Sequence, residues 1–247
     1  MGARPVRTAP SGAPCGRPRG PGRPGRSRTS SRRTPLVHAG DGREGHPDRA
    51  PYDRLIATCG FSSVPSAWLE QVKPAGLIVC PVGWGTVRLV VAADGRAEGR
   101  FLPVGSYFMA ARDAGTTGTP AHPGRPDATS GQVPSLDLNV VAGDEAFRFI
   151  LSLVAPDTAF AFERGDDGQV TAVELWGSDG AWARAEAGTV RQAGARLLWD
   201  AVEAAHELYV AHGRPGRERF GVTVTAEEQR IWLGAPSRPL PCAAATD

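Results

Sequence analysis

Two short apolar runs flank a helical pattern in the first half of the chain. Arg54–Cys59 and Leu77–Val82 have the length and continuity of strands that are buried on both faces of a sheet. Between them, Val64–Val72 carries apolar residues at helical spacing, and Lys73–Gly76 ends the pattern with helix-breaking residues. A strand, a short helix and a second strand in this order predict a βαβ unit with two parallel strands.

The following runs predict a hairpin and then a connecting segment. Val87–Ala92 and Gly99–Val104 are strand-like, and the pair Asp94-Gly95 between them is typical of a tight hairpin turn. Residues 114–134 are rich in Gly, Thr and Pro, which predicts a linker or a mobile loop.

The remaining residues, 135–247, predict a second region of mixed helix and strand. The longest helical pattern in the chain, Arg191–His212, carries a stripe of apolar residues at steps of three and four. The other expected elements are, in order, a helix over Glu145–Val154, strands over Ala159–Glu163 and Val170–Trp176, a third strand beginning at Trp182, and a terminal hairpin of Phe220–Thr225 and Gln229–Leu233. The patterns together predict an α/β fold followed by a small α+β region.

Charge is distributed unevenly along the chain. The net charge is +2, but residues 1–35 hold nine of the 28 basic residues and no acidic residue, which leaves 19 basic and 26 acidic residues in the rest. The part that folds is therefore acidic, and we expect no nucleic-acid partner for it.

Residues 1–35 combine Arg with frequent Pro, Gly and Ser and offer few apolar side chains for a core, so disorder is expected. Three interpretations stay open: a solvated tail, a translation from a wrong frame or start codon, and an arm that binds nucleic acid. The lack of aromatic residues among the arginines disfavours the third, because it removes the surfaces on which bases stack.

Composition excludes several further kinds of site. The four cysteines (Cys15, Cys59, Cys80 and Cys242) show no CxxC spacing and the five histidines no ligand spacing, so neither a metal site nor a disulfide framework is predicted. Cys59 and Cys80 lie in apolar runs and are expected to be buried. The chain has no apolar run of about eighteen residues and no recognisable secretory signal, so we expect a cytoplasmic protein without a membrane partner.

Five sequence elements follow one another in a characteristic order between residues 40 and 83. They are Gly40-Asp41-Gly42, Ala50-Pro51-Tyr52-Asp53-Arg54-Leu55, Val64-Pro65, Lys73-Pro74-Ala75-Gly76 and Pro81-Val82-Gly83. Together they resemble the second half of the catalytic domain of protein-L-isoaspartate O-methyltransferases. The resemblance implies a partial doubly wound, Rossmann-like methyltransferase sheet and S-adenosyl-L-methionine as the cofactor.

The resemblance also implies cofactor-binding residues. Asp41 would accept a hydrogen bond from the exocyclic amine of adenine, and Gly42 would let the backbone approach the ring; the alternative is an ordinary Asp-Gly turn. Thr58, with Cys59 beside it, would face the methyl-transfer pocket, the alternative being a merely buried strand end. No catalytic side chain is expected, because a carboxylate acceptor is already nucleophilic at neutral pH and alignment supplies most of the rate.

Two departures from the family pattern stand out. The family's glycine-rich loop and acidic ribose-binding residue have no counterpart in residues 1–40, so we expect a truncated chain that by itself binds the cofactor poorly or not at all. Gly105 replaces the Thr of a family segment like FVPLT, which implies different substrate handling. The expected domains are a disordered Arg/Pro/Gly-rich tail (1–37), the C-terminal half of a methyltransferase core (38–112), a linker (113–134) and an α+β extension (135–247).

The implied activity is O-methylation of a carboxylate on a protein or peptide that carries aspartate or isoaspartate. Arg219–Leu233 resembles the C-terminal extension of methyltransferases encoded beside modified-peptide biosynthesis genes in actinobacteria, which implies a peptide substrate. The alternative is a non-enzymatic module that binds a peptide or a partner chain on a degenerate methyltransferase scaffold. The oligomeric state stays open.

Overall fold

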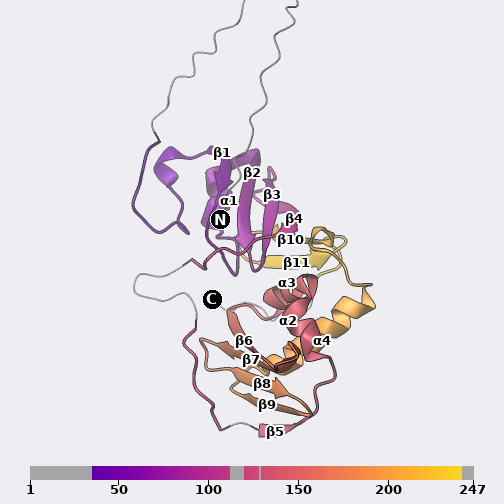
Figure 1. The fold of residues 1–247 in the computed structure, drawn as a ribbon. Coiled ribbons are helices and arrows are strands. Elements are labelled where there is room, and N and C mark those ends of the chain that lie inside the picture. Colours follow the sequence, from indigo (N-terminus) through magenta and orange to yellow (C-terminus); the bar gives the residue numbers. More distant parts are fainter. Residues whose placement is uncertain (1–34, 112–119, 128, 241–247) are drawn as a thin grey trace, which may run out of the picture. The chain divides into compact units, whose positions relative to one another are not determined.

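The computed structural model describes residues 35–111, 120–127 and 129–240 (Figure 1). Internal contacts group the chain into two units, Met1–Ala39 and Gly40–Asp247, and every element below belongs to the second. That unit contains a six-stranded and a five-stranded sheet together with short helices, so the mixed α/β class that the sequence predicts is confirmed.

The first sheet combines the motif-bearing part of the chain with the last two strands. Its strands are, in spatial order, β1 (Tyr52–Ile56), β2 (Val72–Val82), β3 (Gly85–Val91), β4 (Ala97–Gly105), β10 (Phe220–Val224) and β11 (Gln229–Leu233). Helix α1 (Ala67–Gln71) connects β1 to β2, which run parallel with Leu55 opposite Ile78. The predicted unit with two parallel strands is therefore confirmed, and the other neighbouring strands of this sheet are antiparallel.

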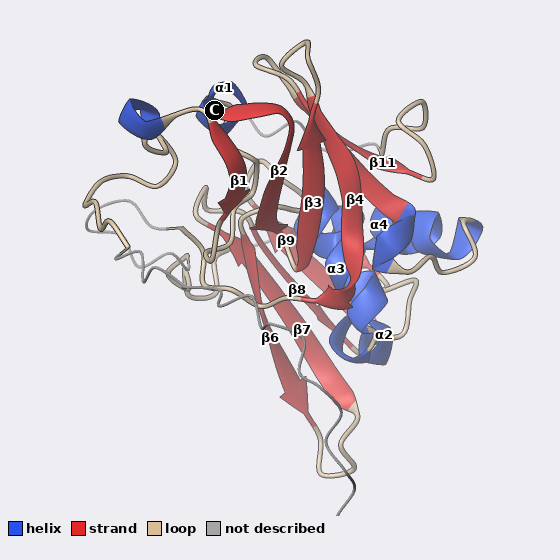
Figure 2. Cartoon of the chain, turned by 90° about the horizontal axis from the view of Figure 1, so that it is seen from above, coloured by secondary structure: helices blue, strands red, loops and turns tan. Residues whose placement is uncertain are grey.

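β1 is an edge strand, which corrects the prediction for residues 54–59. Within the described residues it is hydrogen-bonded to one strand, β2 (Figure 2), and Ile56 is 71% exposed. A strand buried on both faces is therefore the wrong prediction for β1, because both of its faces carry exposed side chains: Asp53 on one, and Arg54 and Ile56 on the other. In β2, Ile78 and Cys80 are fully buried on one face, whereas Leu77 and Val79 on the opposite face are half-buried. The same prediction therefore holds for one face of β2.

Both predicted hairpins of this sheet are present. In the turn between β3 and β4, Gly95 has a φ of 81°, a conformation that glycine adopts without steric cost. β10 pairs antiparallel with β4, with Val222 opposite Gly99, and β11 pairs with β10. The terminal hairpin thus joins the first sheet although it lies inside the expected 135–247 extension; the domain boundaries themselves stay a prediction.

The second sheet is antiparallel throughout. Its strands are, in spatial order, β5 (Thr129–Gln132), β9 (Thr189–Ala193), β8 (Trp182–Glu186), β7 (Val170–Gly177) and β6 (Thr158–Arg164). The strands expected over 159–163, over 170–176 and from Trp182 onward are confirmed as β6, β7 and β8. β5 lies in the segment predicted to be a linker. Residues 113–119 and 128 of that segment and residues 1–34 of the predicted tail lie outside the described residues.

The remaining elements are α2 (Leu138–Gly143), α3 (Glu145–Val154), α4 (Leu198–Ala211) and two 3-10 turns at Pro47–Arg49 and Arg217–Arg219. α3 has the predicted bounds. A helix over 191–212 is wrong for its first seven residues, because β9 and Gly194 (φ 92°) occupy that stretch. A Cβ at Gly194 would lie 2.7 Å from the Cα of Ala181, so the turn requires glycine. None of the helices in the described ranges is long and apolar enough to cross a bilayer.

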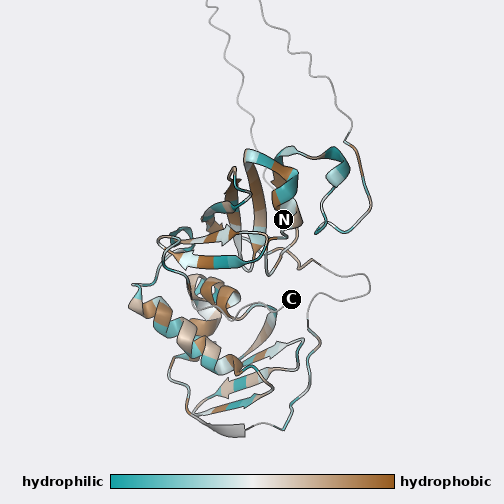
Figure 3. Ribbon diagram, turned by 180° about the vertical axis from the view of Figure 1, so that it is seen from behind, coloured by the Kyte–Doolittle hydropathy of each residue, from teal (hydrophilic) through white to brown (hydrophobic). Residues whose placement is uncertain are grey.

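Apolar side chains of both sheets and of the helices form one core. Phe149 of α3 packs against Phe101 of β4 and Phe220 of β10, with ring centroids 4.9 and 5.5 Å apart. α2 and α4 contact strands of the second sheet. Figure 3 shows hydrophobic residues (brown) along the strands of the first sheet and alternating with polar residues along α4. The helices therefore contact both sheets, and α3 lies beside the cavities described next.

Candidate functional site

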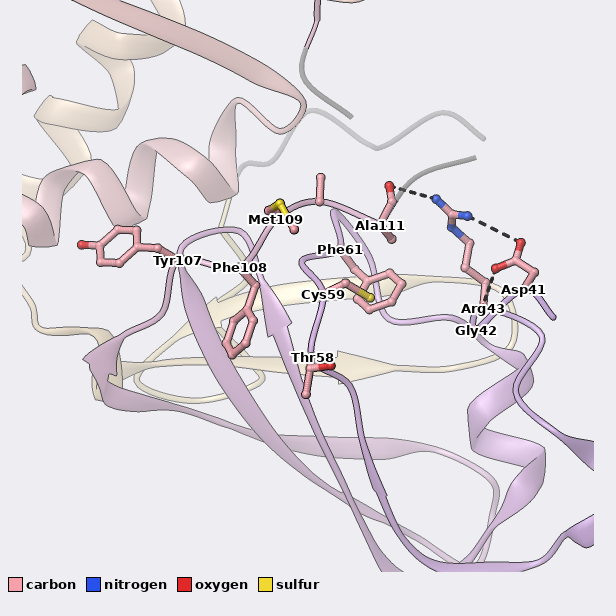
Figure 4. Close-up of a pocket in the computed structure, with 11 residues that line it drawn as sticks. Asp41, Gly42, Arg43, Thr58, Cys59, Phe61, Tyr107, Phe108, Met109 and Ala111 are labelled. Carbon is pink, nitrogen blue, oxygen red and sulfur yellow. Dashed lines mark hydrogen bonds and ion pairs between the residues drawn. The ribbon is translucent and has the colours of Figure 1, made fainter. Parts of the chain in front are cut away.

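Three chain segments enclose a pocket of about 460 Å³ beyond the carboxyl end of β1 (Figure 4). The residues that line it are Asp41, Gly42, Arg43, Thr58, Cys59, Phe61, Tyr107, Phe108, Met109, Ala110 and Ala111. Asp41, Gly42 and Thr58, the three residues predicted to hold the cofactor, thus come together in one pocket. Their role in binding stays a prediction.

Helix α1 holds the Asp-Gly segment in position. The indole Nε1 of Trp68 donates a hydrogen bond to the carbonyl oxygen of Gly42, at 2.8 Å. The buried side chain of Gln71 donates to the carbonyl oxygen of Glu44 (2.7 Å) and accepts from the backbone N–H of His46 (2.8 Å). Two side chains of the helix therefore fix the backbone within the pocket's first segment and directly after it.

Asp41 itself forms a local turn. Its Oδ1 accepts from the backbone N–H of Arg43 at 2.9 Å, and its carbonyl oxygen accepts from the N–H of Glu44 at 3.1 Å. This is the Asp-Gly turn that the sequence offers as the alternative to a binding role. The two roles are compatible, because a carboxylate has about four acceptor positions and the side chain of Asp41 is 48% exposed.

Backbone hydrogen bonds join the other two segments. The N–H of Gly60 donates to the carbonyl oxygen of Met109 (2.8 Å), and the N–H of Ala111 donates to the carbonyl oxygen of Gly60 (2.7 Å). Thr58 and Cys59 come immediately before this contact and line the pocket from the end of β1. The wall formed by the segment after β4 is therefore held against the motif-bearing strand.

Arg43 connects the first segment to the third. Its guanidinium donates to the carbonyl oxygen of Ala111 at 3.3 Å and lies 3.5 Å from Oδ2 of Asp41, as the dashed lines in Figure 4 show. Among the residues that line this pocket, Arg43 is the one base and Asp41 the one acid. The pocket is therefore close to neutral and holds its two charges at one end.

The lining suits the adenine end of a nucleoside. Phe61, Phe108 and Met109 provide apolar surface for a flat ring, and the Asp41 carboxylate can accept from an exocyclic amine. Apart from Gly42 itself and its two chain neighbours, no atom of the described residues lies within 4 Å of the place where a Cβ of Gly42 would be, so a ligand can approach that backbone. The lining contains no second carboxylate for ribose hydroxyls, so the fit covers the adenine end alone.

The two cysteines near the pocket differ in environment. Cys80 is buried as predicted, and burial, followed by the proximity of Cys59, raises the pKa of its thiol to about 12. Cys59 is half-buried and lines the pocket, which corrects the prediction that it is buried. It lies at the strand end, where the pocket replaces protein neighbours.

A larger cavity of about 890 Å³ adjoins the pocket. The two share Arg43, Phe61, Phe108, Ala110 and Ala111 as lining residues. The larger cavity extends from the segment after β1 to α3 and the start of β6, and its lining includes the hydroxyl-bearing residues Ser62, Ser63, Ser152, Thr158 and Ser178. A ligand in the larger cavity would therefore adjoin one in the pocket across a shared wall.

Sequence reasoning missed Arg43 and the segment Tyr107–Ala111. Arg43 directly follows the motif, and its position beside Gly42 was the signal that could have found it. Tyr107, Phe108 and Met109 are exposed by 60%, 47% and 74%. Three large apolar residues in succession after a predicted strand were the corresponding signal for the third segment.

The profile of the family described as protein-L-isoaspartate(D-aspartate) O-methyltransferase matches residues 26–103. Those residues belong to this family. The match includes Asp41, Gly42 and Thr58 but not the wall formed by Tyr107–Ala111.

Individual relatives match over short stretches. Protein-L-isoaspartate O-methyltransferases from Hyperthermus butylicus (37% identity, 33% of this chain and 38% of the relative), Caulobacter sp. (44%, 27% and 30%) and Methanopyrus kandleri (53%, 19% and 21%) are similar to it. The chain thus spans between a fifth and two fifths of the length of these relatives. A solved protein-L-isoaspartate O-methyltransferase aligns with 80% of this chain and 59% of its own at 16% identity, with a TM-score of 0.39.

Proposed function

We propose that the chain acts as an S-adenosyl-L-methionine-dependent O-methyltransferase of the protein-L-isoaspartate type, which methylates a carboxylate of a protein or peptide. Membership of residues 26–103 in the family supports this proposal. The observation that carries it is the convergence of Asp41, Gly42 and Thr58, which are up to 17 positions apart, in one pocket. We place the protein in the cytoplasm.

The pocket would hold the adenine end of the cofactor. Asp41 would accept from the exocyclic amine, Gly42 would allow the backbone to approach the ring, and Thr58 would face the ligand from the strand end. When bound, the cofactor supplies a methyl group on a positively charged sulfur, which a nucleophile can accept.

The protein's own contribution to this reaction is alignment. A carboxylate acceptor with a pKa near 4 is ionised at neutral pH and needs no general base. The rate then depends on holding the carboxylate in line with the methyl group and on excluding water. The wall shared by the two cavities is where such an acceptor would lie, and Arg43 is the one base that lines either cavity.

The acceptor we propose is a peptide that carries aspartate or isoaspartate. The likeness of Arg219–Leu233 to the extension of peptide-modifying actinobacterial methyltransferases supports this choice, and so does the size of the larger cavity, which is near the upper end of ordinary ligand sites.

A second function is a module that binds a peptide without modifying it. The observation that favours it is the pocket lining, which offers groups for the adenine end alone. A chain of this kind would bind peptides and form no methyl ester.

Isothermal titration of the full-length chain with S-adenosylhomocysteine and with adenosine tests the pocket. We expect both to bind weakly and D41N to lower both affinities by about tenfold, since one charge-assisted hydrogen bond is lost. D53N is the matched control, because it makes the same change at an exposed carboxylate on β1. No binding of either compound, or equal affinities for wild type and D41N, would overturn the assignment.

Transfer of radiolabelled methyl groups to a synthetic isoaspartyl peptide, with the aspartyl peptide beside it, tests the reaction. Base-labile label in the peptide supports the proposed activity. Peptide binding without any label supports the non-enzymatic module in its place.

A further inference from the structure

Four aromatic side chains form a cluster beside both cavities. Trp84, in the turn between β2 and β3, packs against Tyr107 and Phe160 with ring centroids 5.7 and 4.8 Å apart. Phe160 in turn packs against Phe162, two residues farther along β6, at 5.7 Å. We call Trp84, Tyr107, Phe160 and Phe162 the aromatic cluster. It joins the turn of one sheet to the edge strand of the other.

Arg148 of α3 lies over this cluster. Its guanidinium carbon is 4.3 Å from the ring centroid of Trp84, 5.5 Å from that of Phe160 and 5.7 Å from that of Phe162. Cation–π contacts of this kind hold a guanidinium in a defined plane. Burial lowers the pKa of Arg148, but a guanidinium keeps its charge at neutral pH.

Arg148 has no acidic partner among the described residues. No carboxylate lies within 4 Å of its guanidinium, and its Nε is buried without a hydrogen-bond partner. Glu145, one turn earlier on the helix, lies 3.9 Å from Arg217; its charge also acts on Arg148, but from beyond ion-pair distance. A half-buried cation without a counter-charge is unusual, because such charges are normally paired.

The geometry is fixed before any ligand binds. The backbone N–H of Trp84 donates to Oγ of Ser152 (3.0 Å), one turn beyond Arg148 on α3. Gly83 precedes it with a φ of 54°, and a Cβ there would lie 2.5 Å from the same oxygen. The turn that carries Trp84 is therefore held directly against the helix that carries Arg148.

The aromatic cluster also borders the two cavities. Trp84 and Phe160 line the larger cavity, whereas Tyr107 lines the pocket. Leu151 and Ser152, which follow Arg148 along α3, line the larger cavity as well. A ligand that extends from the pocket through the larger cavity therefore contacts residues of the aromatic cluster, against which the guanidinium of Arg148 packs although it lines neither cavity itself.

We infer that Arg148, supported by the aromatic cluster, forms a carboxylate-binding site for an acidic residue of a bound peptide, distinct from the carboxylate that is methylated. The choice of a peptide as ligand rests on the proposed function. Arginine suits this role because its planar fork matches the two oxygens of a carboxylate. The site would select peptides with a second acidic residue near the acceptor.

Fluorescence anisotropy with a short fluorescein-labelled peptide that contains two aspartates, and with its asparagine counterpart, tests this site without cofactor. We expect wild type to prefer the aspartate peptide by about tenfold and R148M to lose that preference, because one charge-assisted pair is removed. R148K keeps the charge but not the planar fork, so an intermediate preference is expected. R88M, at an exposed arginine of β3, is the matched control and should behave as wild type.

Equal affinity of wild type for the two peptides would overturn the inference, and so would an undiminished preference in folded R148M. Thermal unfolding shows whether R148M is folded. If it is not, the inference is tested by the preference of wild type for the aspartate peptide and by the reduced preference expected of R148K. S-adenosylhomocysteine titration should be the same for wild type and R148M. If wild type does not bind S-adenosylhomocysteine, the result counts against the proposed function. Loss of the peptide preference in R148M supports the carboxylate site independently of that result.

Discussion

The two sheets differ in the burial of their ion pairs. In the second sheet, Arg184 is buried and forms a bidentate ion pair with Glu163, at 2.7 and 2.8 Å, with further contacts to Glu186 and Glu174. In the first sheet, Asp53 and Lys73 form an exposed pair, with side chains 83% and 47% accessible. The buried Arg184 of the second sheet is thus neutralised by surrounding carboxylates, whereas both members of the Asp53–Lys73 pair in the first sheet face solvent.

The two sheets also differ in how many of their apolar side chains are exposed. The end of β4 and the segment after it expose Leu102, Val104, Tyr107 and Met109. The second sheet instead buries most side chains of β7 and β8. The second sheet is therefore suited to be a rigid scaffold, whereas the first sheet exposes apolar surface that a ligand can cover.

The strongest test of the scaffold is R184M. It removes the arginine beside Glu174, whose side chain is 12% exposed and keeps its contacts with Trp182 and His122. We therefore expect a loss of about 3 kcal/mol in the free energy of unfolding, the lower end of the range for broken buried pairs. Urea unfolding followed by tryptophan fluorescence measures it, with R88M as the control. A loss no larger than that of R88M would remove the distinction between the sheets.

A smaller effect is expected where α3 begins. Oδ1 of Asp144 accepts from the N–H groups of Ala146 and Phe147, both at 3.0 Å, and Oδ2 accepts from the Tyr209 hydroxyl at 3.0 Å. D144A should lower the free energy of unfolding by about 1–2 kcal/mol, because it removes the helix cap. Y209F keeps the cap and should therefore lower the free energy of unfolding by less than D144A does. If the two variants are equal in chemical denaturation, the cap is not what stabilises α3.

The pH dependence of stability tests the contribution of a single carboxylate of the second sheet, Glu163. Hydrogen bonds and charge from Arg184 lower the pKa of Glu163 below 4.5. A lowered folded-state pKa gives stability that is present above the unfolded value and is lost as pH falls through the folded value. Unfolding free energies of E163Q should therefore fall less steeply than those of wild type below about pH 4.5. Parallel curves would show that this carboxylate is not linked to folding.

The smallest effect is expected in the first sheet. D53N removes the exposed pair with Lys73, and exposed pairs contribute little because solvent screens them. We expect the midpoint of urea unfolding to be the same as in wild type within error. A clear shift would mean that the charges of the first sheet also stabilise the fold.

Much of the fold follows from local pattern. The Asp94-Gly95 turn, the bounds of α3 and the parallel pairing of β1 with β2 are readable, since each depends on a few consecutive residues. The edge position of β1 and the strand at Arg191 are not, because they depend on which distant segments pair with them.

The candidate site likewise contains residues that the sequence predicts and residues that it does not. Asp41, Gly42 and Thr58 lie in a motif whose spacing is recognisable in one dimension. Tyr107–Ala111 and the cluster around Arg148 come together only through hydrogen bonds and packing between separate elements. No spacing in the sequence links Arg148 to Trp84, 64 positions earlier.

The pairing of β10 with β4 has a consequence for synthesis of the chain. Val222 is opposite Gly99, so β4 has a bare edge until more than a hundred further residues have left the ribosome. Pairings so distant in sequence are slow to form, and unpaired edges invite association with other chains. The motif-bearing sheet, although encoded early, is therefore among the last parts of the molecule to be completed during translation.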